Sequence, residues 1–232
     1  MLTNLVQSSF SELGSIVVNE FPSALIATLF VTLTATLFAV ILGLPLGVLL
    51  VAGGSSGVIR LPKAVVRILG FITNILRSIP FLILMIMVFP LSRLIIGTTV
   101  GTVASIVPLV IASFPFVARL VESSLREVDM GLIEMAKSMG ATPFQIIVKV
   151  MLKESIPSLI SNLTIAITTI LGYSAMSGII GGGGLGQIAI NYGYYRYKYL
   201  VMVAAVLVLI VLVQLFQSLG NALAKKCNKR LR

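Results

Sequence analysis

The stretch FPSALIATLFVTLTATLFAVILGLPLGVLLVAGGSSGVI occupies residues 21–59 and contains no charged side chain. A helix needs about 20 consecutive apolar residues to cross a lipid bilayer. Residues 68–92 are also apolar except for Arg77, and further uncharged runs cover 94–118, 155–195 and 199–224. The run 155–195 is long enough for one crossing and an uncharged loop. We therefore predict five membrane-spanning helices, at about 24–52, 64–91, 101–118, 157–178 and 199–221.

The composition agrees with a lipid environment. Of the 232 residues, 58% are hydrophobic and 10% are charged, whereas a soluble domain is about half apolar and about a quarter charged. The chain has no histidine and one cysteine, Cys227, which excludes histidine acid–base chemistry, histidine-ligated metals and an internal disulfide. We predict an all-α polytopic membrane protein that forms one transmembrane domain over residues 1–232.

The basic residues predict the orientation. Of the 17 Lys and Arg residues, three precede or open the second span, five lie in the loop 119–154, and five lie in the C-terminal tail. By the positive-inside rule these segments are cytoplasmic and the N-terminus is outside. The first 20 residues contain Glu12 and Glu20 but no Lys or Arg, so we expect no cleaved signal peptide. We assign the net charge of +10 to topology and anionic lipid headgroups, and not to nucleic acid.

The source of energy is expected in another protein. All seven acidic residues lie outside the predicted spans, whereas ion-driven transporters commonly keep carboxylates at membrane depth. The chain also lacks the phosphate-binding loop G-x-x-x-x-G-K-[ST]. Residues 181–186 fit G-x-G-x-x-G, but no strand is predicted before them and no acidic residue follows them. We therefore predict a non-catalytic transport subunit that works with a separate ATPase.

The cytoplasmic loop 119–154 is predicted to form two short helices joined by an elbow. Gly140 stands where a left-handed residue ends a helix, and Thr142-Pro143 provides an N-cap followed by proline at the first helical position. An apolar stripe at helical spacing follows, made of Phe144, Ile147, Val148, Met151 and Leu152. From periodicity alone, this hairpin either docks on another protein, lies against the chain's own spans or is a solvated connector.

Residues 134–153 read EMAKSMGATPFQIIVKVMLK. This segment resembles the signature E-A-A-x-x-x-G-x(9)-I-x-L-P of the permease subunits of ABC importers. The matching residues are Glu134, Ala136, Gly140 and Leu152, and the departures are Met135, Val150 and Lys153. The resemblance implies that the loop is a coupling helix that fits a cleft in the ATPase subunit, through Glu134, Met135, Ala136, Gly140, Ala141, Thr142 and Pro143.

A wider resemblance covers nearly the whole chain after residue 20. RSIPF at 77–81, GATP at 140–143, YSAM at 173–176, GGGGLGQ at 181–187 and YGY at 192–194 are similar to the permease family of bacterial methionine importers. The resemblance implies a homodimer in the bacterial inner membrane, with two cytoplasmic ATPase subunits and an extracytoplasmic substrate-binding lipoprotein. It implies methionine, in the D or L form, as the substrate. No cofactor is expected in this chain, because ATP and Mg²⁺ would bind the ATPase.

Two groups of residues are candidates for the transport path. Arg77 is the one charge well inside a predicted span, and an arginine at that depth costs about 2.5–3.5 kcal/mol unless it faces protein or water. Pro80 weakens the same helix, so we expect a broken helix whose Arg77 either meets a substrate carboxylate or extends to the interface. Candidates near the end of the fourth span are Tyr173, Ser174 and Met176.

The glycines of the last loop and of the spans predict close packing. Gly181, Gly182, Gly183, Gly184 and Gly186 are expected to form either an extracytoplasmic gate or turn, or a compact helix junction. Gly43/Gly47 and Gly97/Gly101 have the G-x-x-x-G spacing that lets helices approach closely.

The alternatives to a methionine importer are an importer of another small solute, a channel that needs no ATPase, and a membrane enzyme, for which the sequence offers no catalytic group.

Overall fold

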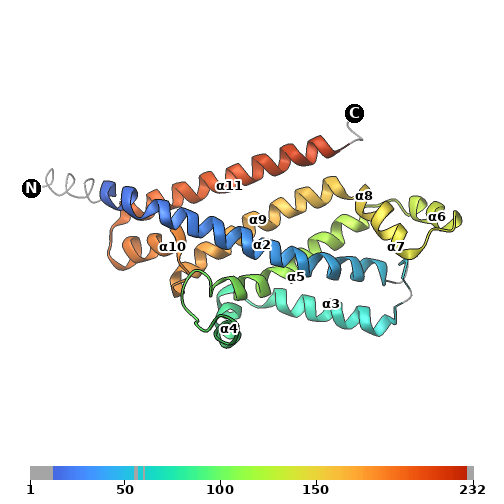
Figure 1. Cartoon of the computed structure of the whole chain (residues 1–232), viewed down its shortest axis with the longest axis horizontal. Helices are drawn as coiled ribbons and strands as arrows, with labels where there is room; N and C mark the ends of the chain where they lie inside the picture. The colour runs from blue at the N-terminus through green and yellow to red at the C-terminus, as the bar shows by residue number, and fades with distance from the viewer. Residues whose placement is uncertain (1–12, 55–56, 60, 229–232) are drawn as a thin grey trace, which may run out of the picture. The chain divides into compact units, whose positions relative to one another are not determined.

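The computed structural model describes residues 13–54, 57–59 and 61–228 of the chain (Figure 1). These residues form helices joined by short turns, and no strand occurs among them. Residues 13–19 are helical. The following elements are α2 (Phe21–Ala52), α3 (Lys63–Ser78), α4 (Phe81–Ile96), α5 (Ile106–Arg126), α6 (Met130–Ser138), α7 (Pro143–Gln145), η1 (Ile146–Met151), α8 (Leu152–Glu154), α9 (Ile156–Ser177), η2 (Gly178–Ile180), α10 (Gly184–Ile188), η3 (Ala189–Tyr195) and α11 (Tyr199–Cys227).

The predicted all-α membrane architecture is confirmed. Within the described ranges, α2, α5, α9 with η2, and α11 are each long and apolar enough to cross a membrane. The helices α3 and α4 meet at a bend of 110° and would add a fifth, broken span. Arg60, the first twelve residues and the basic residues at 229–232, which entered the charge argument, lie outside the described residues.

The break predicted at Pro80 lies between α3 and α4. Helix α3 ends at Ser78, and α4 begins at Phe81. Between them, Ile79 is extended, with φ −78° and ψ 126°. The ring of a proline disfavours the helical conformation of the preceding residue, so Pro80 sets the end of α3 through Ile79.

The third span differs from its prediction at both ends. We predicted 101–118, whereas α5 covers Ile106–Arg126. It begins later because Gly101 has φ +110° and a turn precedes the helix. It continues past the apolar run because Glu122 forms ion pairs with Arg119 and Arg126 on the same helix.

The chain divides into two compact units. Unit 1 contains residues 1–35, 81–110 and 167–215, and unit 2 contains 36–80, 111–166 and 216–232. In unit 1, the start of α2 shares an apolar core with α10, η3 and α11. This core contains Ile16, Phe21, Ala24, Leu185, Ile188, Ala189, Val201 and Ala205.

In unit 2, the close packing of α2 on α5 depends on glycine. A Cβ atom on Gly43 would lie 2.8 Å from the carbonyl oxygen of Phe114, and one on Gly47 would lie 2.6 Å from that of Ala118. The first G-x-x-x-G pair is therefore a contact within the chain. The second pair, Gly97 and Gly101, has positive φ, and a Cβ atom added to either residue would meet no atom within 4 Å. These two residues therefore form turns and not a helix contact.

Candidate functional site

The elbow of the loop between α5 and α9 is built by a complete Schellman motif at the end of α6. Gly140 has φ +76°, as predicted. Its N–H donates to the carbonyl oxygen of Lys137 at 3.0 Å, and the N–H of Ala141 donates to that of Ala136 at 3.1 Å. These two bonds satisfy carbonyl groups that a helix end leaves unpaired, and they require the left-handed residue.

The second side of the elbow is fixed by a capping box. The hydroxyl of Thr142 accepts from the N–H of Gln145 at 3.3 Å, and the Gln145 side chain accepts from the N–H of Thr142 at 2.9 Å. Pro143 occupies the first turn of α7, where its missing N–H costs nothing. The predicted elbow is confirmed, and both of its sides are set by local sequence.

The helix after the elbow differs from the prediction. The α-helix after the elbow, α7, is only three residues long, and the next residues, 146–151, form the π-helix η1. A π-helix bonds i to i+5 and turns side chains away from the α-helical register. Ile147 and Met151 of the predicted stripe are buried, but Phe144 and Val148 are exposed. The predicted stripe is therefore divided between buried and exposed residues, and Phe144, in α7, is exposed ahead of the π-helix.

The loop presents apolar side chains to its surroundings next to the elbow. Met139 and Phe144 are each 74% exposed, and Met135 is 54% exposed. Glu134 is exposed beside them. We call these four residues the elbow surface. Met139 and Phe144 were not predicted as site residues, although their positions on either side of Gly140 mark them.

The other residues predicted for coupling have different roles in this geometry. Gly140, Thr142 and Pro143 are exposed and shape the elbow. Ala136 is buried at 4% exposure and packs inward with Ile133 on α6. Ala141 is half-buried. Five of the seven predicted residues thus lie at the surface, and Ala136 contributes to the packing beneath it.

The two candidates for the transport path on unit 2 lie at the break that ends α3. Arg77 is exposed in the last turn of α3, where the helix dipole favours a positive charge. Pro80 is exposed just beyond it. The guanidinium is therefore free to meet an anionic group at a point where the helix is interrupted.

The path candidates on unit 1 lie along the second half of α9. The ring of Tyr173 stacks on Phe81, the first residue of α4, with centroids 4.4 Å apart and planes 4° from parallel. Ser174 is buried and Met176 is exposed. The carbonyl oxygen of Ser174 accepts from the hydroxyl of Ser177 at 2.6 Å. Of these three, Met176 is the side chain that reaches the surface.

The glycine segment after α9 is a tightly packed turn. Gly181, Gly183 and Gly184 all have positive φ. The carbonyl oxygen of Gly181 accepts from the N–H of Gly101 at 3.0 Å, and a Cβ atom on Gly186 would lie 2.1 Å from the carbonyl oxygen of Ala175. These contacts are those of a compact junction. Gly182 belongs to the same junction, because its N–H donates to the carbonyl oxygen of Ser177.

A charged cluster follows in the loop before α11. The hydroxyl of Tyr192 donates to the Glu20 carboxylate, and the cations of Arg196 and Lys198 lie 4.7 Å and 5.9 Å from the Tyr192 ring. The hydrogen bond to Glu20, together with burial, raises the pKa of Tyr192 above its usual range. This cluster ties the start of α2 to η3, and no spacing in the sequence signals it.

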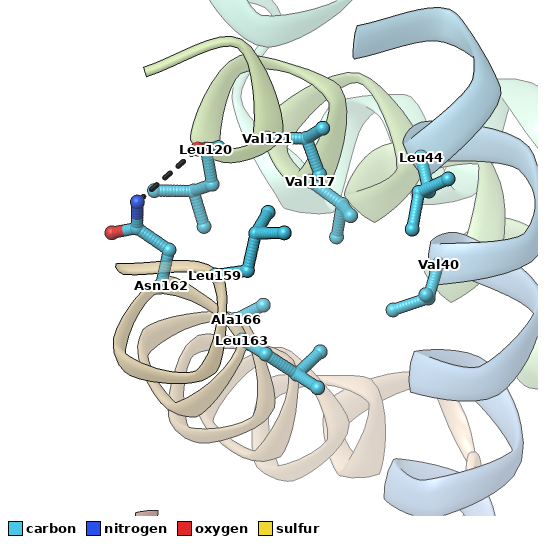
Figure 2. Close-up of a pocket in the computed structure, with 9 residues that line it drawn as sticks. All are labelled: Val40, Leu44, Val117, Leu120, Val121, Leu159, Asn162, Leu163 and Ala166. Atoms are coloured by element: carbon cyan, nitrogen blue, oxygen red, sulfur yellow. Dashed lines mark hydrogen bonds between the residues drawn. The ribbon is translucent and has the colours of Figure 1, made fainter. Parts of the chain in front are cut away.

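An apolar pocket of about 80 Å³ lies within unit 2 (Figure 2). Its lining comes from α2, α5 and α9: Val40, Leu44, Val117, Leu120, Val121, Leu159, Asn162, Leu163 and Ala166. The amide of Asn162 donates to the carbonyl oxygen of Leu120 at 3.1 Å and holds two of these helices together. Apart from Asn162, the lining is aliphatic, so it suits hydrocarbon better than the charged groups of an amino acid.

Comparison with known proteins gives one family and several relatives. The family described as the binding-protein-dependent transport system inner membrane component matches residues 43–229. A Vibrio cholerae protein, "Probable D-methionine transport system permease protein MetI", is 50% identical over 204 residues, which are 88% of this chain and 90% of that protein. The Escherichia coli D-methionine transport system permease protein MetI is 45% identical over 151 residues, 65% of this chain and 69% of its own.

A solved structure has the same fold. The MetNI methionine ABC transporter, in inward facing conformations, contains a chain with a TM-score of 0.87 and 42% sequence identity to this one. The match covers 90% of this chain and 96% of that chain. The fold and the sequence thus point to the same relatives.

Proposed function

Because the chain belongs to the family of binding-protein-dependent transport system inner membrane components, we propose that it is the permease subunit of an ATP-driven methionine importer. The observation that carries the proposal is the 50% identity to a D-methionine transport permease over 88% of the chain. The similarity to a chain of the MetNI methionine ABC transporter supports it. The proposed subunit provides the transmembrane path and catalyses no reaction.

The loop between α5 and α9 would receive the force of ATP hydrolysis. Its elbow surface, with Met139 and Phe144 exposed beside the rigid elbow, would insert into a cleft of a cytoplasmic ATPase. Burial of such exposed apolar side chains favours association, and the two caps hold the elbow at a fixed angle. ATP and Mg²⁺ would bind the ATPase, and this chain would hold no cofactor.

The assembly we propose is a homodimer of this chain with two ATPase subunits and an extracytoplasmic substrate-binding lipoprotein. The N-terminus would lie outside and the tail inside, as the basic residues predict. Two copies would form one path in the bacterial inner membrane. The exposed apolar faces of helices such as α3, where Ile68, Phe71 and Ile75 are exposed, would face lipid or the second copy.

The substrate would pass the break between α3 and α4. Arg77, on unit 2, would bind the carboxylate of the amino acid through its planar fork of donors, and Pro80 would keep the helix broken. Tyr173, Ser174 and Met176, on unit 1, would line the path along α9. The turn from Gly181 to Gly186 would act as a rigid part of the extracytoplasmic gate.

Binding of partners and substrate tests this proposal. The chain is co-expressed with the proposed ATPase and binding protein and purified by a tag on the chain alone. We expect the ATPase to co-purify, and its hydrolysis to be stimulated by the binding protein loaded with methionine. Stimulation by another solute, with none by methionine, would replace methionine as the substrate; purification without any ATPase would favour a channel.

A further inference from the structure

A buried carboxylate lies between two arginines at the cytoplasmic end of α5. Glu122 is 7% exposed. One of its oxygen atoms accepts from Nη2 of Arg126 at 2.8 Å and from Nε at 3.2 Å. The other accepts from Nη1 of Arg119. The carboxylate therefore fixes the direction of both guanidinium groups.

The two arginines differ in what else they contact. Arg119 uses its second amino group, Nη2, to donate to Oδ1 of Asn74 at 2.7 Å and to the carbonyl oxygen of Gly70 at 3.3 Å. Both acceptors lie on α3, one helical turn apart. Arg126 is 61% exposed on its side chain and its contacts are with Glu122. Arg119 thus joins α5 to α3, whereas Arg126 stays on α5.

The connection on α3 continues to the end of that helix. Asn74 accepts from Arg119 through its side chain, and its backbone carbonyl accepts from the hydroxyl of Ser78 at 2.8 Å. Ser78 is the last residue of α3 and follows Arg77 directly. A shift of the Arg119 guanidinium therefore acts on the same turn that carries Arg77.

The opposite side of α5 is fastened to α9. The buried hydroxyl of Ser124 accepts from the Asn162 amide at 2.7 Å and contacts the Ser158 hydroxyl at 3.2 Å. Asn162 also binds the Leu120 carbonyl (Figure 2). Since α5 enters the cytoplasmic loop and α9 leaves it, these bonds join the two ends of that loop. The loop and the end of α5 should move together.

We propose that Arg119 and Glu122 are positioning residues that transmit movement of the loop between α5 and α9 to the last turn of α3. The proposal rests on the proposed function, since it concerns how the ATPase acts on the path. The loop moves the end of α5, Glu122 orients Arg119, and Arg119 carries the movement to Asn74 and hence to Arg77.

Two matched substitutions separate this link from a purely structural role. Arg119→Ala and Arg126→Ala each remove one arginine from Glu122, and each leaves the carboxylate paired with the other. Both proteins should therefore fold and assemble with the ATPase. Arg119→Lys keeps the charge but loses the fork that reaches two helices, so it should restore coupling only in part. Asn74→Ala removes the acceptor on α3 and leaves the ion pairs intact.

The test uses the complete complex in vesicles, and first requires ATP-driven methionine uptake by the wild type. We expect Arg119→Ala and Asn74→Ala to lower methionine uptake per ATP hydrolysed by at least about fivefold. Arg126→Ala should lower it by less than about threefold, because an exposed ion pair contributes little. If the wild type itself does not take up methionine, the proposed function fails instead.

A thiol reporter measures the movement itself. In a chain with Cys227→Ser, Ile75→Cys reports the last turn of α3, where Ile75 is exposed, and Ser138→Cys reports the loop. The maleimide labelling rate of each reporter is compared without nucleotide and with the ATPase trapped by vanadate. With Arg119 present, both rates should change on trapping. In Arg119→Ala the loop rate should still change and the Ile75→Cys rate should not. An Ile75→Cys rate that still changes on trapping in Arg119→Ala, or that does not change when Arg119 is present, overturns the proposal, and so does equal uncoupling by Arg126→Ala.

Discussion

Replacing Gly140 with valine isolates the backbone geometry of the elbow. The residue has φ +76°, and no atom lies within 4 Å of the position a Cβ would take. Added bulk therefore meets nothing, and the cost of valine comes from the left-handed conformation alone. That cost is about 1–2 kcal/mol for an L-residue and lies at the upper end for a β-branched one. An equilibrium between intact and open elbow shifts by about 5–30-fold for such a change.

The same cost predicts how the protein responds as a whole. Five packed helices should insert and dimerise despite a local cost of this size. If the elbow opens, however, the two Schellman bonds at 3.0 Å and 3.1 Å are lost, and Met139 and Phe144 no longer keep their relative positions. A displacement of about 1 Å at such a contact can cost far more than its energy suggests.

The assay compares Gly140→Val with Gly140→Asn in the reconstituted complex. Asparagine is similar in size to valine but tolerates the left-handed region. We expect Gly140→Asn to keep both methionine uptake and stimulation of ATP hydrolysis, and Gly140→Val to lose uptake, with ATPase binding or stimulation reduced. Normal transport by Gly140→Val, or equal loss in both variants, would refute the reasoning from backbone geometry.

Three further predictions concern the path, the orientation and the loop before α11. Arg77→Ala should leave assembly and basal ATP hydrolysis nearly unchanged while cutting uptake, and Arg77→Lys should rescue only in part; normal uptake by Arg77→Ala removes the substrate contact. With Cys227→Ser, Ser15→Cys should react with an impermeant maleimide from outside, whereas native Cys227 should not; the reverse pattern inverts the orientation. The hydrogen bond to Glu20 raises the pKa of Tyr192, so the neutral phenol stabilises the folded protein. Wild type should therefore be more stable than Tyr192→Phe below about pH 10, and this difference in stability should shrink above that pH. Thermal unfolding across this pH range measures the difference, and growth of the difference at high pH would show the opposite linkage.

Sequence reasoning succeeded where the chain's local chemistry sets the backbone. At the elbow, Gly140 permits a conformation that other residues resist, and Thr142-Pro143 starts the next helix at a defined residue. At the break in the second span, Pro80 constrains Ile79 directly. Each of these features depends on a few neighbouring residues, so the sequence contains the needed information.

The faces of the helices were harder to predict because they depend on packing between distant segments. In the π-helix η1, Val148 is exposed beside the buried Ile147, and no periodicity in the sequence distinguishes this π-helix from an α-helix. The two G-x-x-x-G pairs have the same spacing, yet Gly43 and Gly47 pack against α5 while Gly97 forms a turn. What separates them is whether a second helix lies opposite, which spacing does not encode.

The polar link at the end of α5 escaped prediction for a related reason. Arg119 and Asn74 are 45 positions apart in the chain, and each alone looks like an ordinary residue near a membrane boundary. Ion pairs of Glu122 at three and four residues' distance keep α5 helical past the predicted end of the span. A rule that counts charges ends the helix too early because it ignores how charges neutralise one another.

Accumulation of methionine against a gradient tests the central claim most directly. Vesicles containing the chain, its ATPase and ATP, with loaded binding protein outside, are filled beforehand with unlabelled methionine at a higher concentration than the medium. We predict that labelled methionine accumulates inside above its outside concentration, and that a hydrolysis-deficient ATPase abolishes this. Equilibration to equal concentrations regardless of ATP would mean that the chain is a passive channel and not the permease of an importer.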